Sequence, residues 1–335
     1  MQRICVIGGS RYFGKLLVQR LQAAGHQVTV INRGSVPPPA GVEHLVADRD
    51  DEAALVAALA ARSFDVVVDQ VCYTPVQAAI AARVFSGRTR RYVMTSTIEV
   101  YDPATAALPE VPSGTPIPEL TVDPATWRVQ TDLPWHDAAY LEGHYAEGKR
   151  QAEAVLARHH GFDFATVRSA HVLGGGPQEF TGRLAHYIER ISRGTQITVH
   201  ADALPTVFIH YQELADLLLW AATATDFTGP LNACSDGPLD VRALSALIAA
   251  QVGTEALYRT VGAGVDVAAG AGAGVGVGVG EQASPFSFDR HYAMSNARAK
   301  ELGFRFSDTA QWLPAAVAEA LNAPSTATTS HATTA

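Results

Sequence analysis

The stretch ICVIGGSRYFGKLL, from Ile4 to Leu17, decides the fold that the rest of the chain has to fit. Its apolar start has the pattern of a buried strand, and it continues through a glycine-containing turn into an amphipathic helix. Gly8 and Gly14 have the spacing of a nucleotide-binding turn, but Arg11 stands where the middle glycine is usual. A strand, a tight turn and a helix N-terminus in this order predict a site for phosphate groups.

The chain continues as alternating strands and helices, the pattern of a parallel sheet that is covered on both faces. Up to residue 97 we expect strands at 3–8, 26–32, 43–48, 64–71 and 91–97, and helices at 13–25, 51–62 and 76–84. Beyond it we expect helices at 145–159, 182–194, 296–303 and 309–322, and strands at 164–170, 197–200 and 206–211. The predicted fold class is therefore α/β, a doubly wound parallel sheet with a smaller C-terminal lobe.

The expected division places a mainly nucleotide-binding domain at residues 1–170 and a mainly substrate-binding lobe, interleaved with the sheet, at 171–322. Residues 102–136 are rich in proline and lack periodicity, so we expect a long loop that acts as a lid. Residues 261–282 form a glycine-rich, low-complexity stretch, which predicts a flexible insert. The tail at 323–335 is expected to be disordered.

Composition excludes several classes of protein. The 335 residues carry a net charge of -8, which argues against nucleic acid as the main partner. The three cysteines, Cys5, Cys72 and Cys234, lie in apolar runs and predict buried free thiols in a reducing compartment. No apolar stretch is long enough to cross a membrane, so we expect a cytoplasmic protein with no membrane partner. No metal site is predicted.

The strongest chemical signal is YAEGK, from Tyr145 to Lys149. Residues four apart on a helix share one face, so the Lys149 ammonium is expected to lower the pKa of the Tyr145 phenol. A phenol tuned in this way can exchange a proton with an alcohol or a ketone. Taken by itself, the pentapeptide also fits a surface pair on an ordinary helix.

In this context the sequence resembles the extended short-chain dehydrogenase/reductase family, the NAD(P)-dependent epimerases and dehydratases with a Rossmann-type fold. The segments that carry the resemblance follow one another in the family's order over about residues 2–322. They are the turn from Gly8 to Gly14, ADRD at 47–50, TSTIEVY at 95–101, YAEGKRQAE at 145–153, VRSAHVLGGG at 167–176, FIHYQELAD at 208–216 and NARAKELGF at 296–304.

The resemblance assigns roles to individual positions. Tyr145 becomes the acid/base, Lys149 its pKa tuner and a cofactor ribose ligand, and Thr97 the hydroxyl that hydrogen-bonds the reacting oxygen. Asp48 would contact the adenine, although a turn or helix cap explains this residue equally well. The implied cofactor-binding residues are Gly8, Gly9, Ser10, Arg11, Tyr12, Phe13, Gly14, Asn32, Arg33, Asp48, Arg49, Val71, Cys72 and Lys149.

Departures from the family pattern bear on the substrate. Thr206 and Val207 occupy the place where sugar-nucleotide enzymes carry an arginine for the substrate diphosphate, which weakens a nucleotide-sugar substrate. His171 stands where an asparagine is usual, and it is either a substrate contact or a packed histidine. Glu99 is a second candidate substrate residue, with a solvated strand-end acid as the alternative. The loop at 102–144, with Trp127, Trp135, His136 and His144, is expected to help form the pocket.

Arg11 and the end of the second strand predict the choice of cofactor. Members that prefer NAD have an acid at that strand end, whereas this chain has Asn32 followed by Arg33. Two arginines would attract a 2'-phosphate that an acid would repel, so NADP is expected, with NAD as the alternative. The alternative interpretation is that both arginines are solvated surface cations that contact no cofactor.

The predicted function is an NADP-dependent oxidoreductase or epimerase that moves a hydride between nicotinamide and a carbinol or carbonyl carbon of a small hydroxylated substrate. One alternative is a non-catalytic NAD(P)-binding module with a regulatory or RNA-binding role. The alternative among enzymes is a nucleotide-sugar epimerase or dehydratase. The sequence leaves open whether the chain forms a homodimer.

Overall fold

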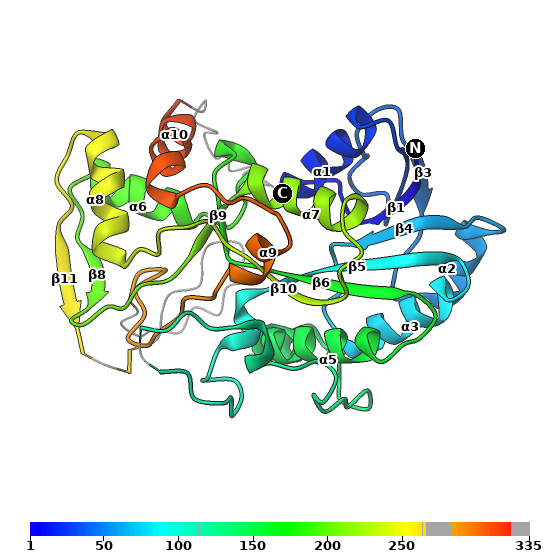
Figure 1. Cartoon of the computed structure of the whole chain (residues 1–335). Helices are drawn as coiled ribbons and strands as arrows, with labels where there is room; N and C mark the ends of the chain where they lie inside the picture. The colour runs from blue at the N-terminus through cyan, green and yellow to red at the C-terminus, as the bar shows by residue number, and fades with distance from the viewer. Residues whose placement is uncertain (113, 263, 266–282, 323–335) are drawn as a thin grey trace, which may run out of the picture.

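A seven-stranded parallel sheet in the order β10-β6-β5-β4-β1-β2-β3 forms the centre of the protein (Figure 1). This computed structural model describes residues 1–112, 114–262, 264–265 and 283–322. The strands of the sheet are β1 (Arg3–Ile7), β2 (Gln27–Asn32), β3 (Glu43–Val46), β4 (Phe64–Asp69), β5 (Thr89–Thr97), β6 (Asp163–Ser169) and β10 (Gly229–Ala233). The chain order reverses between β1 and β4, and in such sheets this point is where ligands bind at the carboxyl edge.

Helices cover both faces of the sheet (Figure 1). On one face α1 (Tyr12–Ala23) packs against α7 (Tyr211–Thr223), and on the other α3 (Pro75–Phe85) packs against α5 (Tyr145–Ala157), with α2 (Glu52–Leu59) beside α3. Each face has its own apolar core, because successive side chains of a strand point to opposite sides. The predicted fold class, a doubly wound parallel α/β sheet, is confirmed.

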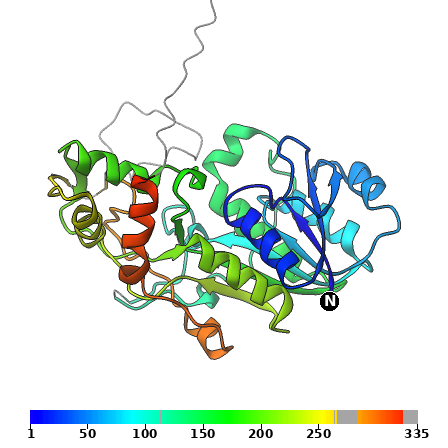
Figure 2. The ribbon, with the colours of Figure 1, turned by 90° about the horizontal axis from the view of Figure 1, so that it is seen from above.

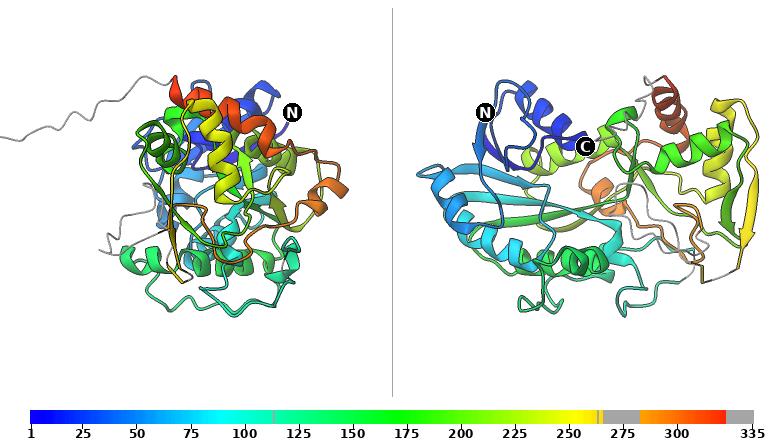
Figure 3. Two further views of the ribbon diagram at one scale, coloured as in Figure 1. Left: turned by 90° about the vertical axis from the view of Figure 1, so that its left-hand side faces the viewer. Right: turned by 180° about the vertical axis from the view of Figure 1, so that it is seen from behind.

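A second lobe lies beyond the carboxyl edge of the sheet (Figures 2 and 3). Its helices are α6 (Arg183–Ser192), α8 (Val241–Val252), α9 (Ala297–Glu301) and α10 (Thr309–Leu321), and its two small sheets pair β7 (His171–Leu173) with β9 (Phe208–His210) and β8 (Ile197–His200) with β11 (Tyr258–Val261). The elements α7, β10 and α8 are not among those predicted from the sequence. Because β10 pairs with β6, the C-terminal part of the chain also completes the central sheet.

The long loop at 102–136 packs against two parts of the protein, and the lid that its composition predicted stays a prediction. One part of the loop runs along α5 (Figures 1 and 3). Trp127 Nε1 donates to Glu147 Oε1 over 3.1 Å, and Gln130 N donates to Gln151 Oε1 over 2.7 Å. Through these hydrogen bonds the loop stabilises α5, the helix that carries Tyr145.

The other part of the loop is buried next to β10 and residues 293–295. Ile117 N donates to the Ala293 carbonyl over 2.8 Å, and Asn232 N donates to Glu119 Oε1 over 3.1 Å.

Two expectations fall largely on residues that the structure does not describe. Residue 113, residues 263 and 266–282, and the tail at 323–335 lie outside the described residues. The predicted glycine-rich insert and the predicted disordered tail therefore fall there. Cys5, Cys72 and Cys234 are buried free thiols, as expected. Within the described ranges, no helix is both long and apolar enough to cross a membrane.

Candidate functional site

The turn between β1 and α1 has the shape of a phosphate-binding turn. Gly8 and Gly9 have φ angles of 96° and 75°, in the left-handed region that favours glycine. A Cβ on Gly9 would lie 2.9 Å from Val6 Cγ1 and 3.0 Å from Val18 Cγ2, so no larger residue fits. Helix α1 begins without a side-chain cap and without an acid in its first turn. Its free N–H groups and positive dipole end fit the pyrophosphate of a dinucleotide.

Gly14 keeps this turn close to the end of β4. A Cβ on Gly14 would lie 2.0 Å from Gln70 Oε1, and the Gln70 Nε2 group is buried without a hydrogen-bonding partner. Buried polar atoms are rarely left unpaired, so this amide is a candidate contact for a ligand in the groove between β1 and β4. Gln70 was not predicted from the sequence, although its place directly after β4 is a signal for it.

Tyr12 ties the turn to the second lobe and does not face an open groove. Its φ is 49°, its side chain is buried, and its hydroxyl donates to the Gly174 carbonyl over 2.8 Å. The ring stacks on Tyr211 with centroids 5.6 Å apart, and Phe13 contacts it edge-on at the same distance. The Tyr12 side chain is occupied by these contacts, so the cofactor contact predicted for Tyr12 stays a prediction for its backbone at the helix N-terminus.

The end of β2 is built around Asn32. Its amide donates to Ser10 Oγ over 2.7 Å and to the Val36 carbonyl over 3.2 Å. Its oxygen accepts from Gly34 N at 2.7 Å and lies 2.9 Å from His44 Nε2. The side chain of Asn32 is thus used to hold the turn together, and it brings no negative charge to the place where the adenosine ribose is expected.

Arg11 and Arg33 stand on either side of this strand end. Both are exposed, and neither guanidinium has a hydrogen bond or an ion pair with any residue that the structure describes. Two unpaired cations next to the turn are suited to a phosphate.

The other predicted cofactor residues divide into two groups. Asp48 is exposed and accepts from Asp50 N over 3.0 Å, and Val71 Cγ1 lies 3.2 Å from the position that a Cβ on Gly8 would take. The cofactor contacts of these two side chains stay predictions. Arg49 is instead buried in an ion pair with Asp69 at 2.7 Å, and Cys72 is fully buried in the core. The contacts predicted for these two side chains are corrected accordingly, since tertiary packing turns both away from the groove.

Thr97 and Tyr145 meet at the carboxyl edge. Thr97 is the last residue of β5 and Tyr145 is the first residue of α5, so both lie at the carboxyl edge. Burial raises the pKa of the Tyr145 phenol, and the nearby Thr97 hydroxyl opposes that rise. Thr97 Oγ1 accepts from Glu99 N over 3.2 Å, which fixes its rotamer at the start of a short 3-10 helix, Ile98–Tyr101. Tyr145 is 39% exposed, enough for its phenol to reach a ligand.

Lys149 does not act on Tyr145 as its spacing suggested. Its buried ammonium donates to the Thr95 carbonyl over 2.9 Å, and it lies 4.6 Å from the centre of the Tyr73 ring and 5.9 Å from that of Tyr145. Burial lowers the pKa of Lys149 to about 8. Burial raises the pKa of Tyr145, and the charges of Tyr73 and Glu99 add to the rise, so the predicted lowering is wrong for this structure.

Glu99 and His171 lie at the same end of the groove. Tyr292 donates to Glu99 Oε2 over 2.8 Å, and burial raises the pKa of Glu99. His171 begins β7 and is 4% exposed, with its ring surrounded by the rings of Phe208, Phe286, Phe288 and Tyr292. Its Nε2 atom has no hydrogen-bonding partner, so packing alone does not account for this histidine.

The tryptophan and histidine side chains of the loop do not lie at the end of the groove that holds Glu99 and His171. Trp127 and Trp135 pack on α5, with a Trp135 ring atom 3.3 Å from where a Cβ on Gly148 would be. His136 and His144 are exposed, and the His144 ring stacks on Tyr140. Tyr73 and Tyr292, which do line the site, were not predicted. Tyr73 follows the end of β4, which is a usable signal, whereas Tyr292 is distant in sequence from every motif.

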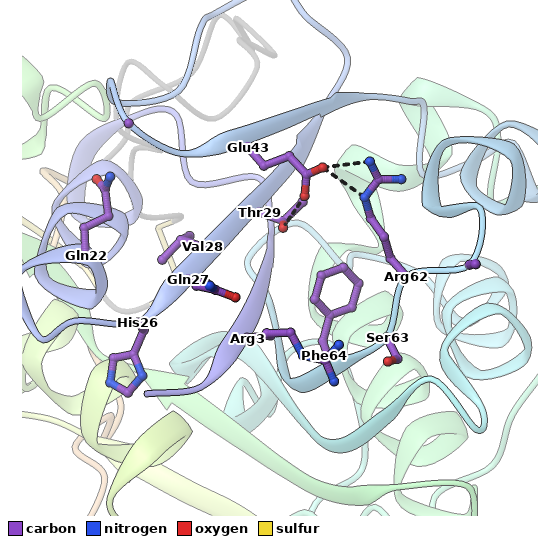
Figure 4. A pocket seen from close by; sticks show the side chains of 12 residues that line it. Arg3, Gln22, His26, Gln27, Val28, Thr29, Glu43, Arg62, Ser63 and Phe64 are labelled. Carbon is purple, nitrogen blue, oxygen red and sulfur yellow. Dashed lines mark hydrogen bonds and ion pairs between the residues drawn. The ribbon is translucent and has the colours of Figure 1, made fainter.

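A cavity of about 590 Å³ opens elsewhere, at the amino ends of β1, β2 and β4 (Figure 4). Its polar side chains are bonded to one another, since Thr29 Oγ1 donates to Glu43 Oε2 over 2.8 Å and Arg62 pairs with the other oxygen of Glu43 at 2.7 Å. The amino edge is opposite to the edge that carries Thr97 and Tyr145, so this cavity is separate from the candidate site.

Comparisons with known proteins agree with this geometry. Residues 4–121 match the family model described as the NAD dependent epimerase/dehydratase family. A 2'-dehydrokanamycin reductase from Streptomyces kanamyceticus is 30% identical over 137 residues, which is 40% of this chain and 39% of that protein. The chain thus aligns with well under half the length of this relative.

Solved structures extend the likeness to nearly the whole chain. A UDP-glucose 4-epimerase from Thermus thermophilus, complexed with NAD, has a TM-score of 0.64 at 17% identity and covers 96% of this chain and 100% of its own. A dTDP-glucose 4,6-dehydratase from Bacillus anthracis, also with NAD, has a TM-score of 0.67 at 11% identity, covering 95% and 96%. The predicted resemblance is confirmed, and together the comparisons support an NAD(P)-dependent enzyme.

Proposed function

We propose that this chain, whose residues 4–121 match the NAD dependent epimerase/dehydratase family, is an NADP-dependent oxidoreductase that reduces a carbonyl group of a small hydroxylated substrate. The observation that carries the proposal is the placement of Thr97 at the end of β5 and of Tyr145 at the start of α5, with their hydroxyls near each other at the carboxyl edge, beside a turn that fits a dinucleotide pyrophosphate. Strand ends and helix starts from distant parts of the chain converge there, as catalysis by positioned groups requires.

The residues of the chain account for the proton side of the reaction. A nicotinamide cofactor, when bound, would supply the hydride that the carbonyl carbon accepts. The carbonyl oxygen takes the proton of Tyr145, while the Thr97 hydroxyl holds that oxygen in line. The Tyr145 phenol, like that of an ordinary tyrosine, is protonated at neutral pH, so it holds the proton that carbonyl reduction requires. The name of the 30% identical relative, a reductase, supports the same direction.

The choice of NADP rests on the end of β2. Arg11 and Arg33 are cations without counter-ions among the described residues, and Asn32 presents no carboxylate that would repel a 2'-phosphate. Lys149, held by the Thr95 carbonyl under the Tyr73 ring, would hold the nicotinamide ribose. Gly8, Gly9 and Gly14 would allow the pyrophosphate to approach the backbone.

The proposed function is tested by supplying NADPH and a panel of carbonyl compounds, and NADP with the matching alcohols, while following absorbance of the reduced cofactor. Oxidation of NADPH with at least one keto compound is expected. Bound cofactor without turnover on any member would favour the non-catalytic NAD(P)-binding module. Turnover of a nucleotide sugar would favour the other alternative, which the buried Thr206, bonded to the Tyr292 carbonyl at 2.7 Å, does not support.

Thr97→Ala is expected to reduce kcat/KM with NADPH by a factor that corresponds to about 1–3 kcal/mol, because one hydrogen bond to the reacting oxygen is lost. Thr126→Ala is a matched control, since Thr126 is exposed on the loop away from the site and its hydroxyl donates to the Asp123 carbonyl over 3.4 Å. Steady-state kinetics with the best substrate of the panel provides the measurement. An unchanged kcat/KM would indicate that Ser96 or Glu99, and not Thr97, orients the reacting oxygen.

A further inference from the structure

Lys149 is a buried cation that forms no ion pair with a carboxylate in the part of the chain that the structure describes. The residue is 2% exposed, and its ammonium donates to the Thr95 carbonyl over 2.9 Å. An ammonium has three N–H donors, so this one carbonyl leaves two of them without an oxygen acceptor among the described residues. Arg168, a buried cation on the neighbouring strand β6, does have an acidic partner, Glu153 at 2.6 Å. Because an isolated buried charge is costly, the ammonium of Lys149 needs another source of stabilisation.

Two tyrosine rings lie next to this ammonium. Lys149 Nζ lies over the Tyr73 ring, 4.6 Å from its centre, and it is 5.9 Å from the centre of the Tyr145 ring. The two ring centres are 6.2 Å apart, and the ring planes are inclined by 44°. The face of an aromatic ring attracts a cation within about 6 Å of its centre, and more strongly where water is excluded. The Tyr73 ring, the nearer of the two, therefore stands where a carboxylate would otherwise balance the charge.

The backbone of Tyr73 is fixed on two sides. Tyr73 N donates to Gln77 Oε1 over 2.7 Å, and the Gln77 carbonyl accepts from Arg49 Nη2 over 3.1 Å. On the other side, the Tyr73 carbonyl lies so close to α5 that a Cβ on Gly148 would be 2.4 Å from its oxygen. Glycine is a weak helix former, and this close approach explains its place beside Lys149. These contacts hold the segment after β4 against the helix turn that carries the ammonium.

We propose that Tyr73 is a positioning residue, whose ring face holds the Lys149 ammonium against the Thr95 carbonyl and so keeps it at the groove for the ribose of the cofactor. A carboxylate in this place would accept the N–H donors of the ammonium itself. A ring face attracts the charge and leaves an N–H donor free for a ribose hydroxyl. The ribose part of this inference rests on the proposed function, whereas the contact between the ring and the ammonium does not.

The first test locates the Lys149 ammonium by NMR of the full chain, without cofactor, after labelling of lysine Cε with carbon-13. The chain has three lysines, Lys15, Lys149 and Lys300, so the signal that disappears in Lys149→Arg is assigned directly. The protons on Cε of Lys149 are next to its Nζ atom and are expected to be shifted upfield by the ring current of Tyr73. Tyr73→Phe should keep this shift and Tyr73→Leu should remove it. An identical Lys149 signal in the wild type and Tyr73→Leu would overturn the contact.

The second test measures the dissociation constant of NADPH by cofactor fluorescence at neutral pH and one salt concentration. Tyr73→Leu is expected to weaken NADPH binding about tenfold, because the ammonium is no longer held by the ring. Tyr73→Phe keeps the ring and should bind as the wild type does. With the best substrate of the panel, the KM for NADPH should rise in Tyr73→Leu while kcat changes little, since the contact acts on binding and not on the reacting atoms.

Tyr258→Leu is the matched control, because Tyr258 forms a similar pair in the second lobe, with the Arg242 guanidinium carbon 4.7 Å from its ring centre. This variant should match the wild type in NADPH affinity and in the Lys149 signal. Tyr73→Phe that binds NADPH as weakly as Tyr73→Leu would assign the role to the hydroxyl and overturn the inference, as would equal affinity of Tyr73→Leu and the wild type. A ring-shifted Lys149 signal in a chain that does not bind NADPH would refute the proposed function and leave the contact standing.

Discussion

Tyr145→Phe is expected to lower kcat by roughly 10³-fold, within the range that a positioned proton donor contributes. The change removes only the phenol oxygen, which lies near the Thr97 hydroxyl. The ring remains, and with it the packing against Tyr73, whose ring centre lies 6.2 Å away. NADPH affinity is therefore expected to stay nearly unchanged, which separates loss of chemistry from loss of binding.

Tyr140→Phe serves as the control for this variant. Tyr140 lies on α4 (Ala138–Gly143), one turn before Tyr145, and its ring stacks on His144 at 3.9 Å. Its kcat should match that of the wild type. The measurement is single-turnover oxidation of NADPH with the best carbonyl substrate of the panel. Activity of Tyr145→Phe within a few-fold of the wild type would remove this residue from the mechanism.

Replacement of both Arg11 and Arg33 by alanine is expected to remove most of a preference for NADPH over NADH. Each charge-assisted contact with a 2'-phosphate is worth roughly 1.5–3 kcal/mol, so the wild type should prefer NADPH by about tenfold or more. NADH has no 2'-phosphate, so its affinity should change little. Dissociation constants of both nucleotides, taken at one fixed salt concentration from cofactor fluorescence, provide the measurement.

The single variants distinguish two positions of Arg11. If Arg11 contacts the pyrophosphate that both cofactors share, Arg11→Ala weakens NADH and NADPH equally and only Arg33→Ala changes the preference. Arg305→Ala is the control for a general effect of charge, since Arg305 is exposed and lies beyond α9. A wild type that binds NADH more tightly than NADPH would refute the NADP assignment.

Much of the fold could be predicted because its signals are local. Apolar runs of strand length alternate with amphipathic helices, and only a parallel sheet with two covered faces buries both. Thr97 and Tyr145 could be predicted for the same reason, since one ends a strand, the other begins a helix, and parallel strands end at one edge. The elements from α7 to α8 were missed because β10 is short and includes Gly229 and Pro230, weak strand formers.

The rest of the site depends on contacts between distant parts of the chain. The spacing of Tyr145 and Lys149 shows that they share a helix face, but the partner of the Lys149 ammonium is the Thr95 carbonyl, 54 residues away. Likewise, the charge of Arg49 is satisfied by Asp69, a pairing that no local pattern indicates.

The central claim is that a nicotinamide dinucleotide binds along the carboxyl edge, with its reactive ring at Thr97 and Tyr145. A crystal structure of the complex with NADP tests it most directly. The predicted result places the pyrophosphate at the start of α1, the 2'-phosphate between Arg11 and Arg33, and the nicotinamide ring beside Tyr145. Cofactor bound in the cavity at the amino edge, or in the groove with its adenine beside Tyr145, would contradict the account.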